Sequence, residues 1–197
     1  MKKENKTAVF INIILLIASF AFFLFFVANH LVFNSMQCLM LFCCLLIPFI
    51  IKKIIKNDIC LSTQLIYFAF LIAHFVLGEI FSFYIHIQHF DSVFHFLTAS
   101  YITYLGYSII RKYLKNCCVN LQLFFAFLIG LAAEYCWEII EYIIDDIFKT
   151  NMQRYMYSNV KLLGHFALYD TMKDMFITLL SCFITVVIIS FFKNNSK

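Results

Sequence analysis

The sequence is short of the residues that soluble proteins place on their surfaces and in their turns. Only 13% of its 197 residues are charged, and it contains one proline and four glycines. Soluble domains have about 25% charged residues, so the composition argues against a soluble protein. So few turn-forming residues also argue against an all-β fold, which needs many tight turns.

Several motifs that identify common catalytic sites are missing as well. The chain has no CxxC pair, no HExxH motif of zinc proteases and no GxSxG motif around a nucleophilic serine. Its eight cysteines fall in apolar runs or in basic segments, and we expect them to fill space rather than to form a disulfide framework. Any catalysis is therefore expected to be metal-assisted rather than to pass through an acyl-enzyme.

Long apolar runs dominate what remains. The chain is 63% hydrophobic, with a mean hydropathy of +0.89, and only helices or closed barrels satisfy their backbone polar groups in a bilayer. The sequence predicts an all-α, polytopic membrane helix bundle, one domain over residues 1–197, whose first run is an uncleaved span. The six expected spans cover residues 8–28, 31–51, 60–85, 92–110, 119–144 and 171–192. The remaining long segment, 145–169, is expected to be amphipathic and to lie on the membrane surface.

Basic residues gather between alternate spans, and this distribution indicates the orientation of the chain in the membrane. With the N-terminus inside, both termini are cytoplasmic and the inner side receives 11 of the 15 basic residues, as the positive-inside rule requires. These are Lys2, Lys3, Lys6, Lys52, Lys53, Lys56, Arg111, Lys112, Lys115, Lys193 and Lys197. The clusters therefore indicate cytoplasmic loops of a cell-membrane protein rather than a nucleic-acid surface.

Acidic residues follow the opposite pattern. In this topology only Glu4 and Asp58 are inside, and the other nine of eleven acids lie at the outer ends of the later spans or in outer loops. The positive-inside rule does not explain this, because acids contribute little to it. The pattern favours a shared polar site on the extracytoplasmic side.

The expected helix over 119–144 carries a stripe of acids on one face. Glu134, Glu138, Glu141 and Asp145 are separated by 4, 3 and 4 residues, a spacing that aligns them, and Gly130 extends the stripe inward. Asp145 suits a solvated helix end. Glu134 lies eleven residues before Asp145, about 16 Å deeper at the rise of an α-helix, where a carboxylate costs about 2.5–3.5 kcal/mol. An intramembrane acid of this kind is a functional candidate.

Two more pairs stand four residues apart at the starts of spans. Asp91 lies just before the span 92–110, and His95 lies in the first turn of that span. Such a pair can orient an imidazole or supply two metal ligands. Asp170 suits a helix N-cap. Asp174 lies one turn deeper, and Lys173 is expected to neutralise part of its charge.

The span 60–85 adds two weaker candidates, Glu79 and His86, which can share a helix face. Because the acids of four spans fall at one depth, they predict an outward-facing cavity whose carboxylates bind a cation, share protons or pair with basic groups. Histidine with carboxylates suits Zn²⁺, Mn²⁺ or Fe²⁺, and carboxylates alone suit Mg²⁺ or Ca²⁺. The predicted catalytic residues are Asp91, His95, Glu134 and Glu138. The predicted metal ligands are His95, Glu138, Glu141, Asp170 and Asp174, with Glu79 and His86 as further candidates.

At these residues the chain resembles the YjdF-like family of uncharacterised bacterial inner-membrane proteins. The shared elements run from Asp91 to Phe96, from Glu134 to Glu141 and from Tyr169 to Met175. The resemblance covers about 60–192, and the first two spans match only in hydrophobic character. A looser similarity to VanZ-like proteins lacks the Gln and Asn that complete their pattern. The family has no settled activity, so the resemblance supports the site more than any function.

Three functions remain open. The first is a metal-dependent hydrolase or transferase acting on a lipid or lipid-linked head group at the outer leaflet. The second is an ion- or proton-coupled transporter. Two features argue against transport: the inner halves of the expected spans are apolar, and the sequence shows no repeat and no broken helix. The third is a structural or accessory membrane protein whose acids are bridged by cations.

The topology makes a direct prediction for thiol labelling in intact cells. A membrane-impermeant maleimide should modify Gln88→Cys, which is placed outside, and should leave Tyr113→Cys at the background of the native cysteines. Permeabilised cells, in which both variants should react, are the control. Labelling of Tyr113→Cys alone in intact cells would invert the assigned direction.

Overall fold

The computed structural model describes residues 6–55, 59–158 and 160–194. Six of its helices are long and apolar enough to cross a membrane, which confirms the predicted all-α, multi-pass architecture. Among the residues assigned to the inner side, Lys2, Lys3, Glu4, Lys56, Asp58 and Lys197 lie outside the described ranges. The chain forms two compact units, residues 1–90 and 91–197, which are described separately.

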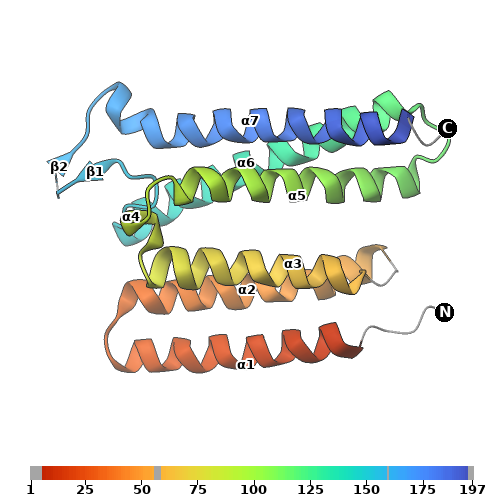
Figure 1. Ribbon diagram of the computed structural model, residues 1–197. Coiled ribbons are helices and arrows are strands. Elements are labelled where there is room, and N and C mark those ends of the chain that lie inside the picture. The colour runs from red at the N-terminus through yellow and green to blue at the C-terminus, as the bar shows by residue number, and fades with distance from the viewer. Residues whose placement is uncertain (1–5, 56–58, 159, 195–197) are drawn as a thin grey trace. The chain divides into compact units, whose positions relative to one another are not determined.

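The first unit contains three spanning segments. The helices α1 (Lys6–Ala28), α2 (Val32–Ile55) and α3 (Leu61–Leu71) lie side by side, and α3 continues into the π-helix η1 (Ile72–Ile80) (Figure 1). Polar side chains link them, because Asn12 Nδ2 donates to the Leu45 carbonyl at 3.0 Å and Tyr67 Oη donates to the Cys44 carbonyl at 2.8 Å. Such interhelical bonds hold helices together where lipid offers no hydrophobic drive.

The third span is shorter than predicted. The apolar pattern predicts a continuous helix over 60–85, but η1 ends at Ile80, and Ser82 adopts a left-handed conformation with φ 57° before the one-turn helix α4 (Phe83–His86). Glu79 and His86 therefore lie on different helices, so the shared face inferred from their spacing of seven does not exist. A π-helix also has wider turns than the α-helix that the spacing assumed.

The second unit is built from three longer helices. These are α5 (Phe90–Tyr113), α6 (Val119–Phe148) and α7 (His165–Asn194). Three side-chain pairs join α5 to α7, namely Asp91–Lys173, Ser100–Ser181 and Tyr107–Lys193. The residue numbers increase together in the two helices, so α5 and α7 are parallel. Residue numbers on α6 fall as those on α5 rise, from His95–Glu134 to Gly106–Ile129, so α6 is antiparallel to both. One end of the unit thus holds the starts of α5 and α7 and the end of α6.

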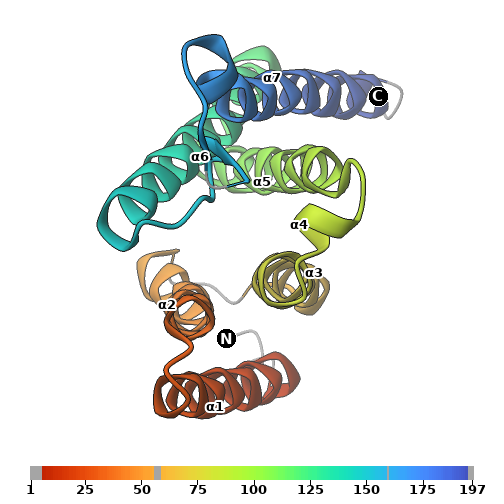
Figure 2. The same cartoon turned by 90° about the vertical axis from the view of Figure 1, so that its left-hand side faces the viewer.

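The link between α6 and α7 falls within the segment 145–169, which the sequence predicts to be amphipathic and to lie on the membrane surface. Residues 145–148 complete α6, and the following loop carries the antiparallel strands β1 (Met156–Tyr157) and β2 (Val160–Lys161) (Figure 2). Asn151 fixes this hairpin, since it exchanges hydrogen bonds of 3.0 and 2.9 Å with the backbone of Met156. The helix α7 begins at His165, six residues before the predicted start of the span at 171. The composition of 145–169 is mixed because it joins two helix ends and a hairpin.

A glycine allows the three helices of the second unit to meet closely. Gly130 of α6 is buried, and a Cβ at this position would collide with Thr103 Oγ1 and lie 2.6 Å from Cys182 Sγ. Small residues at such positions let membrane helices approach. This contact lies on the inward continuation of the acid stripe of α6, at the helix interface.

We expect Gly130→Ala to destabilise the protein relative to Gly106→Ala. Both substitutions add one methyl group and raise the helix propensity of the residue equally. At Gly106, however, the three atoms nearest to the added methyl group all belong to the Ile129 side chain, at 3.1–3.3 Å. The difference should be about 1–3 kcal/mol, a typical overpacking penalty. Thermal unfolding in detergent measures it. Equal melting temperatures for the two variants would contradict the close contact.

Candidate functional site

The candidate site lies at the end of the second unit where α5 and α7 begin and α6 ends. Asp91 is in the first turn of α5, and Asp170 and Asp174 lie in the early turns of α7. The helix dipole, which is positive at an N-terminus, favours Asp91 in its first turn, whereas Asp170 and Asp174 lie beyond the first turn of α7. Glu134 and Glu138 come from the second half of α6, where no dipole compensates them. Burial is extensive, since Asp91, His95, Glu138 and Asp174 are only 3–7% exposed.

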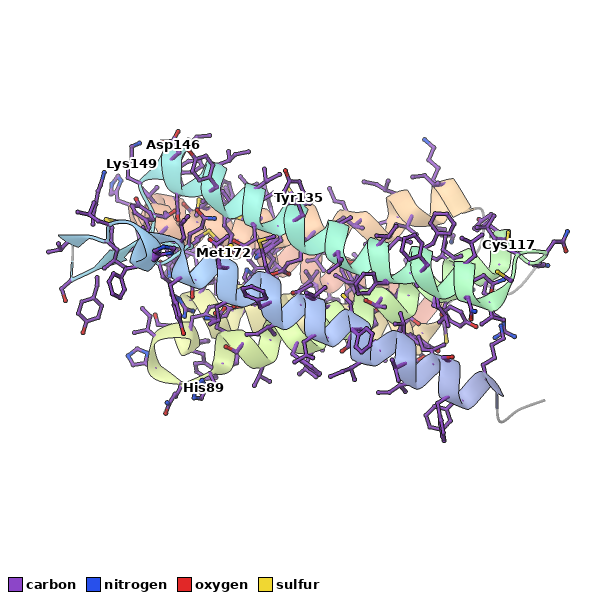
Figure 3. All side chains as sticks on the ribbon, turned by 90° about the horizontal axis from the view of Figure 1, so that it is seen from above. His89, Cys117, Tyr135, Asp146, Lys149 and Met172 are labelled. Atoms are coloured by element: carbon purple, nitrogen blue, oxygen red, sulfur yellow. The ribbon has the colours of Figure 1, made fainter. Side chains whose placement is uncertain are left out.

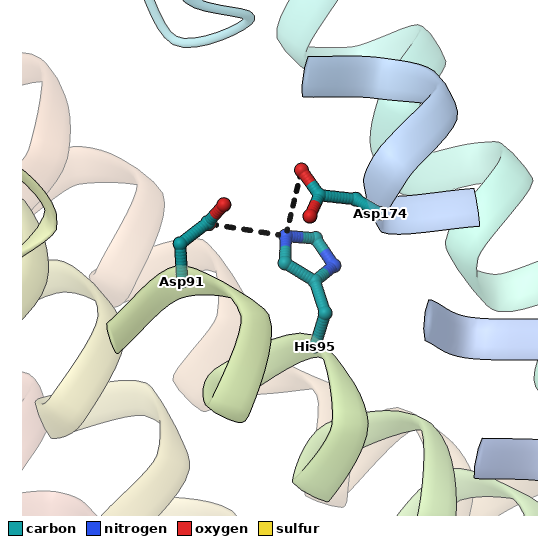
Figure 4. Close-up of side chains that lie close together, drawn as sticks. All are labelled: Asp91, His95 and Asp174. Atoms are coloured by element: carbon teal, nitrogen blue, oxygen red, sulfur yellow. Dashed lines mark ion pairs between the residues drawn. The ribbon is translucent and has the colours of Figure 1, made fainter. Parts of the chain in front are cut away.

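His95 is the hub of the cluster. Its Nδ1 lies 2.7 Å from Glu134 Oε1, while its Nε2 lies 3.4 Å from Asp91 Oδ1 and 3.9 Å from Asp174 Oδ2. Figure 4 shows the imidazole between Asp91 of its own helix and Asp174 of α7. One side chain therefore contacts acids from all three helices.

Two basic side chains neutralise the aspartates. Lys173 Nζ donates to Asp91 Oδ2 at 2.8 Å and to Asp170 Oδ1 at 2.9 Å, and it lies 3.4 Å from Asp174 Oδ1. Arg154, from the loop, lies 3.6 Å from Asp91 and 3.7 Å from Asp170. The sequence suggested the role of Lys173 but not that of Arg154, because a loop residue has no helical spacing to indicate its direction.

The glutamates of α6 have much less compensation. No Lys or Arg ion pair reaches Glu134 or Glu138 within the described part of the chain, and Glu138 Oε2 has only a long contact of 3.4 Å from Gln153 Nε2. Three buried carboxylate oxygens, Glu134 Oε1, Glu138 Oε1 and Asp174 Oδ1, have no hydrogen-bond donor in the described residues. His95 Nδ1 approaches Glu134 Oε1 to 2.7 Å, but this contact does not have the geometry of a hydrogen bond. Leaving a buried charged acceptor unpaired is expensive, so this side of the cluster calls for a cation or a proton.

Two overlapping groups of side chains have the spacing needed for a metal ion. One is Asp91, His95 and Asp174, and the other is His95, Glu134 and Glu138; in each, the candidate ligand atoms lie within 4.8 Å of one another. Lys173 already pairs with two aspartates of the first group, although Asp174 Oδ1 has no hydrogen-bond donor in the described residues. In the second group both glutamates have such an oxygen, and neither has a Lys or Arg partner in that part of the chain, so it is the better candidate for a cation.

The remaining predicted ligands belong to neither of these two groups in the described residues. Glu141 accepts a hydrogen bond of 2.7 Å from Trp137 Nε1, and Asp170 pairs with Lys173; neither belongs to the two ligand groups. Glu79 lies on η1 of the first unit. His86 is on α4 of that unit, where its Nδ1 contacts the Ser82 carbonyl at 2.9 Å.

Asp145 has a role that the sequence did not suggest. The side chain expected to be solvated is buried, and it anchors the loop after α6. Its Oδ1 accepts from Thr150 Oγ1 at 2.6 Å and from the Met152 amide at 2.7 Å, and its Oδ2 accepts from the Gln153 amide at 2.9 Å. These bonds fix the segment that carries Gln153 and Arg154 to the site. Figure 3 shows the neighbouring Asp146 and Lys149 at this end of α6 and Cys117 near its other end.

A line of small polar side chains continues from the acids along the helix interface. Thr178, Ser181 and Thr103 are fully buried, and Ser181 Oγ bonds both Ser100 and the Phe96 carbonyl. Thr103 Oγ1 donates to Cys182 Sγ at 3.2 Å. We call these five residues, Ser100, Thr103, Thr178, Ser181 and Cys182, the polar track. The middle parts of α5 and α7 are therefore partly polar where they face each other. These residues do not stand out in the sequence, because isolated hydroxyl groups in an apolar run form no obvious pattern.

Asp145→Asn should loosen the loop between α6 and α7. One carboxylate oxygen becomes an NH₂ group that faces a hydrogen-bond donor, and each bond to a charged acceptor contributes about 1.5–3 kcal/mol. Trypsin should therefore cleave after Lys149, Arg154 or Lys161 several times faster than in the wild type. Asp146→Asn, whose side chain is 73% exposed, is the matched control. Equal cleavage rates in the two variants would contradict the anchoring role.

Comparisons with known proteins agree with this architecture. Residues 10–195 match a family described as "Predicted membrane protein (DUF2238)". An "Uncharacterized protein" of Thermotoga maritima is 31% identical over 137 residues, an alignment that covers 69% of this chain and 66% of that protein. No solved structure matches. Since the family match extends over both units and all six spans, the chain belongs to this DUF2238 family of predicted membrane proteins.

Proposed function

We propose that the protein is a metal-dependent membrane hydrolase or transferase whose cation is held by His95, Glu134 and Glu138. One observation carries this proposal: Glu134 Oε1 and Glu138 Oε1 are buried without a hydrogen-bond donor in the described residues, beside His95. The acids of the neighbouring helix starts have their own cations, so the demand for positive charge is greatest at the glutamates. A divalent ion meets this demand with the donors that are present.

The donor set suits particular metals. One imidazole with two carboxylates favours Zn²⁺, Mn²⁺ or Fe²⁺, and Mg²⁺ is the alternative if the carboxylates dominate. Asp91 is placed to hold the far nitrogen of His95, at 3.4 Å, which leaves Nδ1 directed toward the glutamates. Metal-binding histidines commonly have a carboxylate on their other nitrogen, which fixes the ring orientation.

The proposed chemistry follows from the side chains around the cation. A bound divalent ion acidifies a water molecule and polarises a phosphoryl or carbonyl oxygen. Glu138 serves as ligand or general base, and Asp91 positions His95. Arg154 and Lys173 are 34% and 24% exposed at the side chain, so they can bind an anionic substrate group while they compensate Asp91 and Asp170. Asp174 adds a carboxylate beside His95 from α7, at 3.9 Å from its Nε2, and Glu141 lies three residues beyond Glu138 on α6 with its Oε1 bonded to Trp137.

The side of the membrane that the site faces indicates the class of substrate. The acids lie at one end of the second unit. At its other end, Arg111, Lys112 and Lys193 lie in the last turns of α5 and α7, and Lys115 lies in the turn between α5 and α6. With the basic end in the cytoplasm, the acids face the extracytoplasmic side. A site at that level meets the head groups of the outer leaflet, so we assign a lipid or lipid-linked head group as substrate. The narrower membership in the YjdF-like group is part of this proposal and is supported by the three acidic elements.

A second candidate, ion- or proton-coupled transport, is favoured by the polar track. Buried hydroxyl groups between membrane helices can relay protons or coordinate ions, and these lie next to Asp174 and Glu134. Interhelical hydrogen bonding is the simpler role, because Ser181, Ser100 and Thr103 all have partners on the neighbouring helix or its backbone. Thr178 Oγ1 alone in the track is buried without a partner in the described residues.

Metal content tests the proposal. Wild-type protein purified in detergent without chelator should hold about one divalent ion per chain by elemental mass spectrometry, and Glu138→Gln should lose it. Asp146→Asn removes an exposed carboxylate from the same helix and should keep it. Adding the metal to chelated wild type should raise the melting temperature, because a ligand that binds only the folded state stabilises it.

The outcomes separate the candidate functions. Metal retention by Asp91→Asn, Glu138→Gln and Asp174→Asn alike would refute the site. Metal that is lost in Glu138→Gln, together with metal-dependent release of head groups from lipid substrates, supports the enzyme. Absence of metal with proton-driven uptake in proteoliposomes supports transport. Metal that stabilises the fold without either activity indicates a structural role for the acids.

A further inference from the structure

A second polar region lies at the other end of the α5–α6–α7 unit. It is a cavity of about 600 Å³ among the end of α5, the start of α6 and the end of α7. Its lining includes four basic side chains, a tyrosine and a glutamine, namely Arg111, Lys112, Lys115, Lys193, Tyr107 and Gln122. None of these residues takes part in the acidic site.

The charge of this cavity has no acidic counterpart in the surrounding sequence. No Asp or Glu occurs between residues 92 and 133 or after residue 174. All the acids of the second unit are therefore at its other end, and the four cations gather around one cavity. Four positive charges in one place repel one another unless an anion joins them. An anionic ligand is the natural occupant.

Two contacts organise the cavity wall. Lys193 Nζ donates to Tyr107 Oη at 3.0 Å and lies 5.6 Å above the same ring, so α7 presents its ammonium against α5. Gln122 is only 3% exposed, and its amide group donates to the Leu114 and Cys117 carbonyls at 2.8 and 3.1 Å. These bonds hold the α5–α6 turn, which carries Lys115, close to the cavity.

The oxygen of Gln122 points to a ligand with a donor. Gln122 Oε1 is buried and has no hydrogen-bond donor in the described residues, although its residue lines the cavity. Positive-inside charge bias explains why basic residues occur at this end of the helices. It explains neither a cavity between them nor a buried acceptor without a partner. A bound group that carries both negative charge and a hydroxyl or water donor satisfies both.

We propose that this cavity binds the phosphate of an anionic phospholipid head group. The cavity lies at the ends of membrane-spanning helices, which is the level at which head groups lie. Basic pockets between helices on the cytoplasmic side bind anionic head groups in this way. The site is separate from the proposed metal centre, and its occupancy depends on neither the metal nor the reaction there.

Lipid binding by the full-length chain tests the proposal. Native mass spectrometry of detergent-purified protein titrated with phosphatidylglycerol or phosphatidylcholine measures both affinities, and wild type should prefer the anionic lipid. The double variant Arg111→Gln, Lys115→Gln should weaken phosphatidylglycerol binding by roughly 30-fold, because each basic side chain near an anionic surface contributes about fivefold. Both side chains are exposed, so their loss removes no packing.

A control variant of equal charge change isolates the cavity. Lys149→Gln, Lys161→Gln alters two exposed lysines of the α6–α7 connection and should bind phosphatidylglycerol like wild type. Equal loss of phosphatidylglycerol binding in both double variants, or equal affinity of wild type for the two lipids, would overturn the proposal.

Competition with inorganic phosphate is the third part of the experiment. Millimolar phosphate that displaces phosphatidylglycerol only weakly supports a lipid site, and tight saturable phosphate binding without lipid preference would assign the cavity to free phosphate instead. Metal content serves as an independent readout and should be unchanged in both variants.

Discussion

The packing of the second unit depends on the pairing of charged side chains that three helices bury away from water. Carboxylates from α5, α6 and α7 meet around His95, whose two nitrogens face Glu134 on one side and Asp91 and Asp174 on the other. Such groups are tolerated only when they are paired, because an isolated ion in a low-dielectric interior loses its hydration. Lys173 and Arg154 meet that requirement for the aspartates. Glu134 and Glu138 each keep a carboxylate oxygen without a hydrogen-bond donor in the described residues, and the proposed cation site is based on this imbalance.

The same three helices have opposite chemistry at their two ends. The acidic cluster occupies the end formed by the helix starts of α5 and α7, and the basic cavity occupies the other end. Between them, the polar track and Gly130 bring the helices close enough for side chains to bond across the interface. Close packing thus fixes the positions of both charged ends. The proposed cation site and the proposed anion site would then lie on one scaffold, at its two ends.

Part of this arrangement follows from helical periodicity in the sequence. The four-residue steps of Asp91–His95 and Asp170–Asp174, and the 4, 3, 4 steps from Glu134 to Asp145, place these side chains on common helix faces. Where backbone geometry departs from the α-helix, the same reasoning fails. The π-helix and the left-handed Ser82 separate Glu79 from His86. Neither Arg154 nor the partners of Asp145 could be found in this way, because a loop has no period.

Hydropathy and the helical repeat were enough to predict the number of spans, the segregation of acids from bases and the faces on which the acids lie. They could not predict which charges neutralise one another, and that question was answered by the packing of the helices. Asp91 and Lys173 are 82 residues apart in the chain and 2.8 Å apart in space. Asp145, which suits a solvated helix end by its position in the sequence, is the buried anchor of a loop. Pairing depends on distances between helices, and helical spacing within one segment contains no information about them.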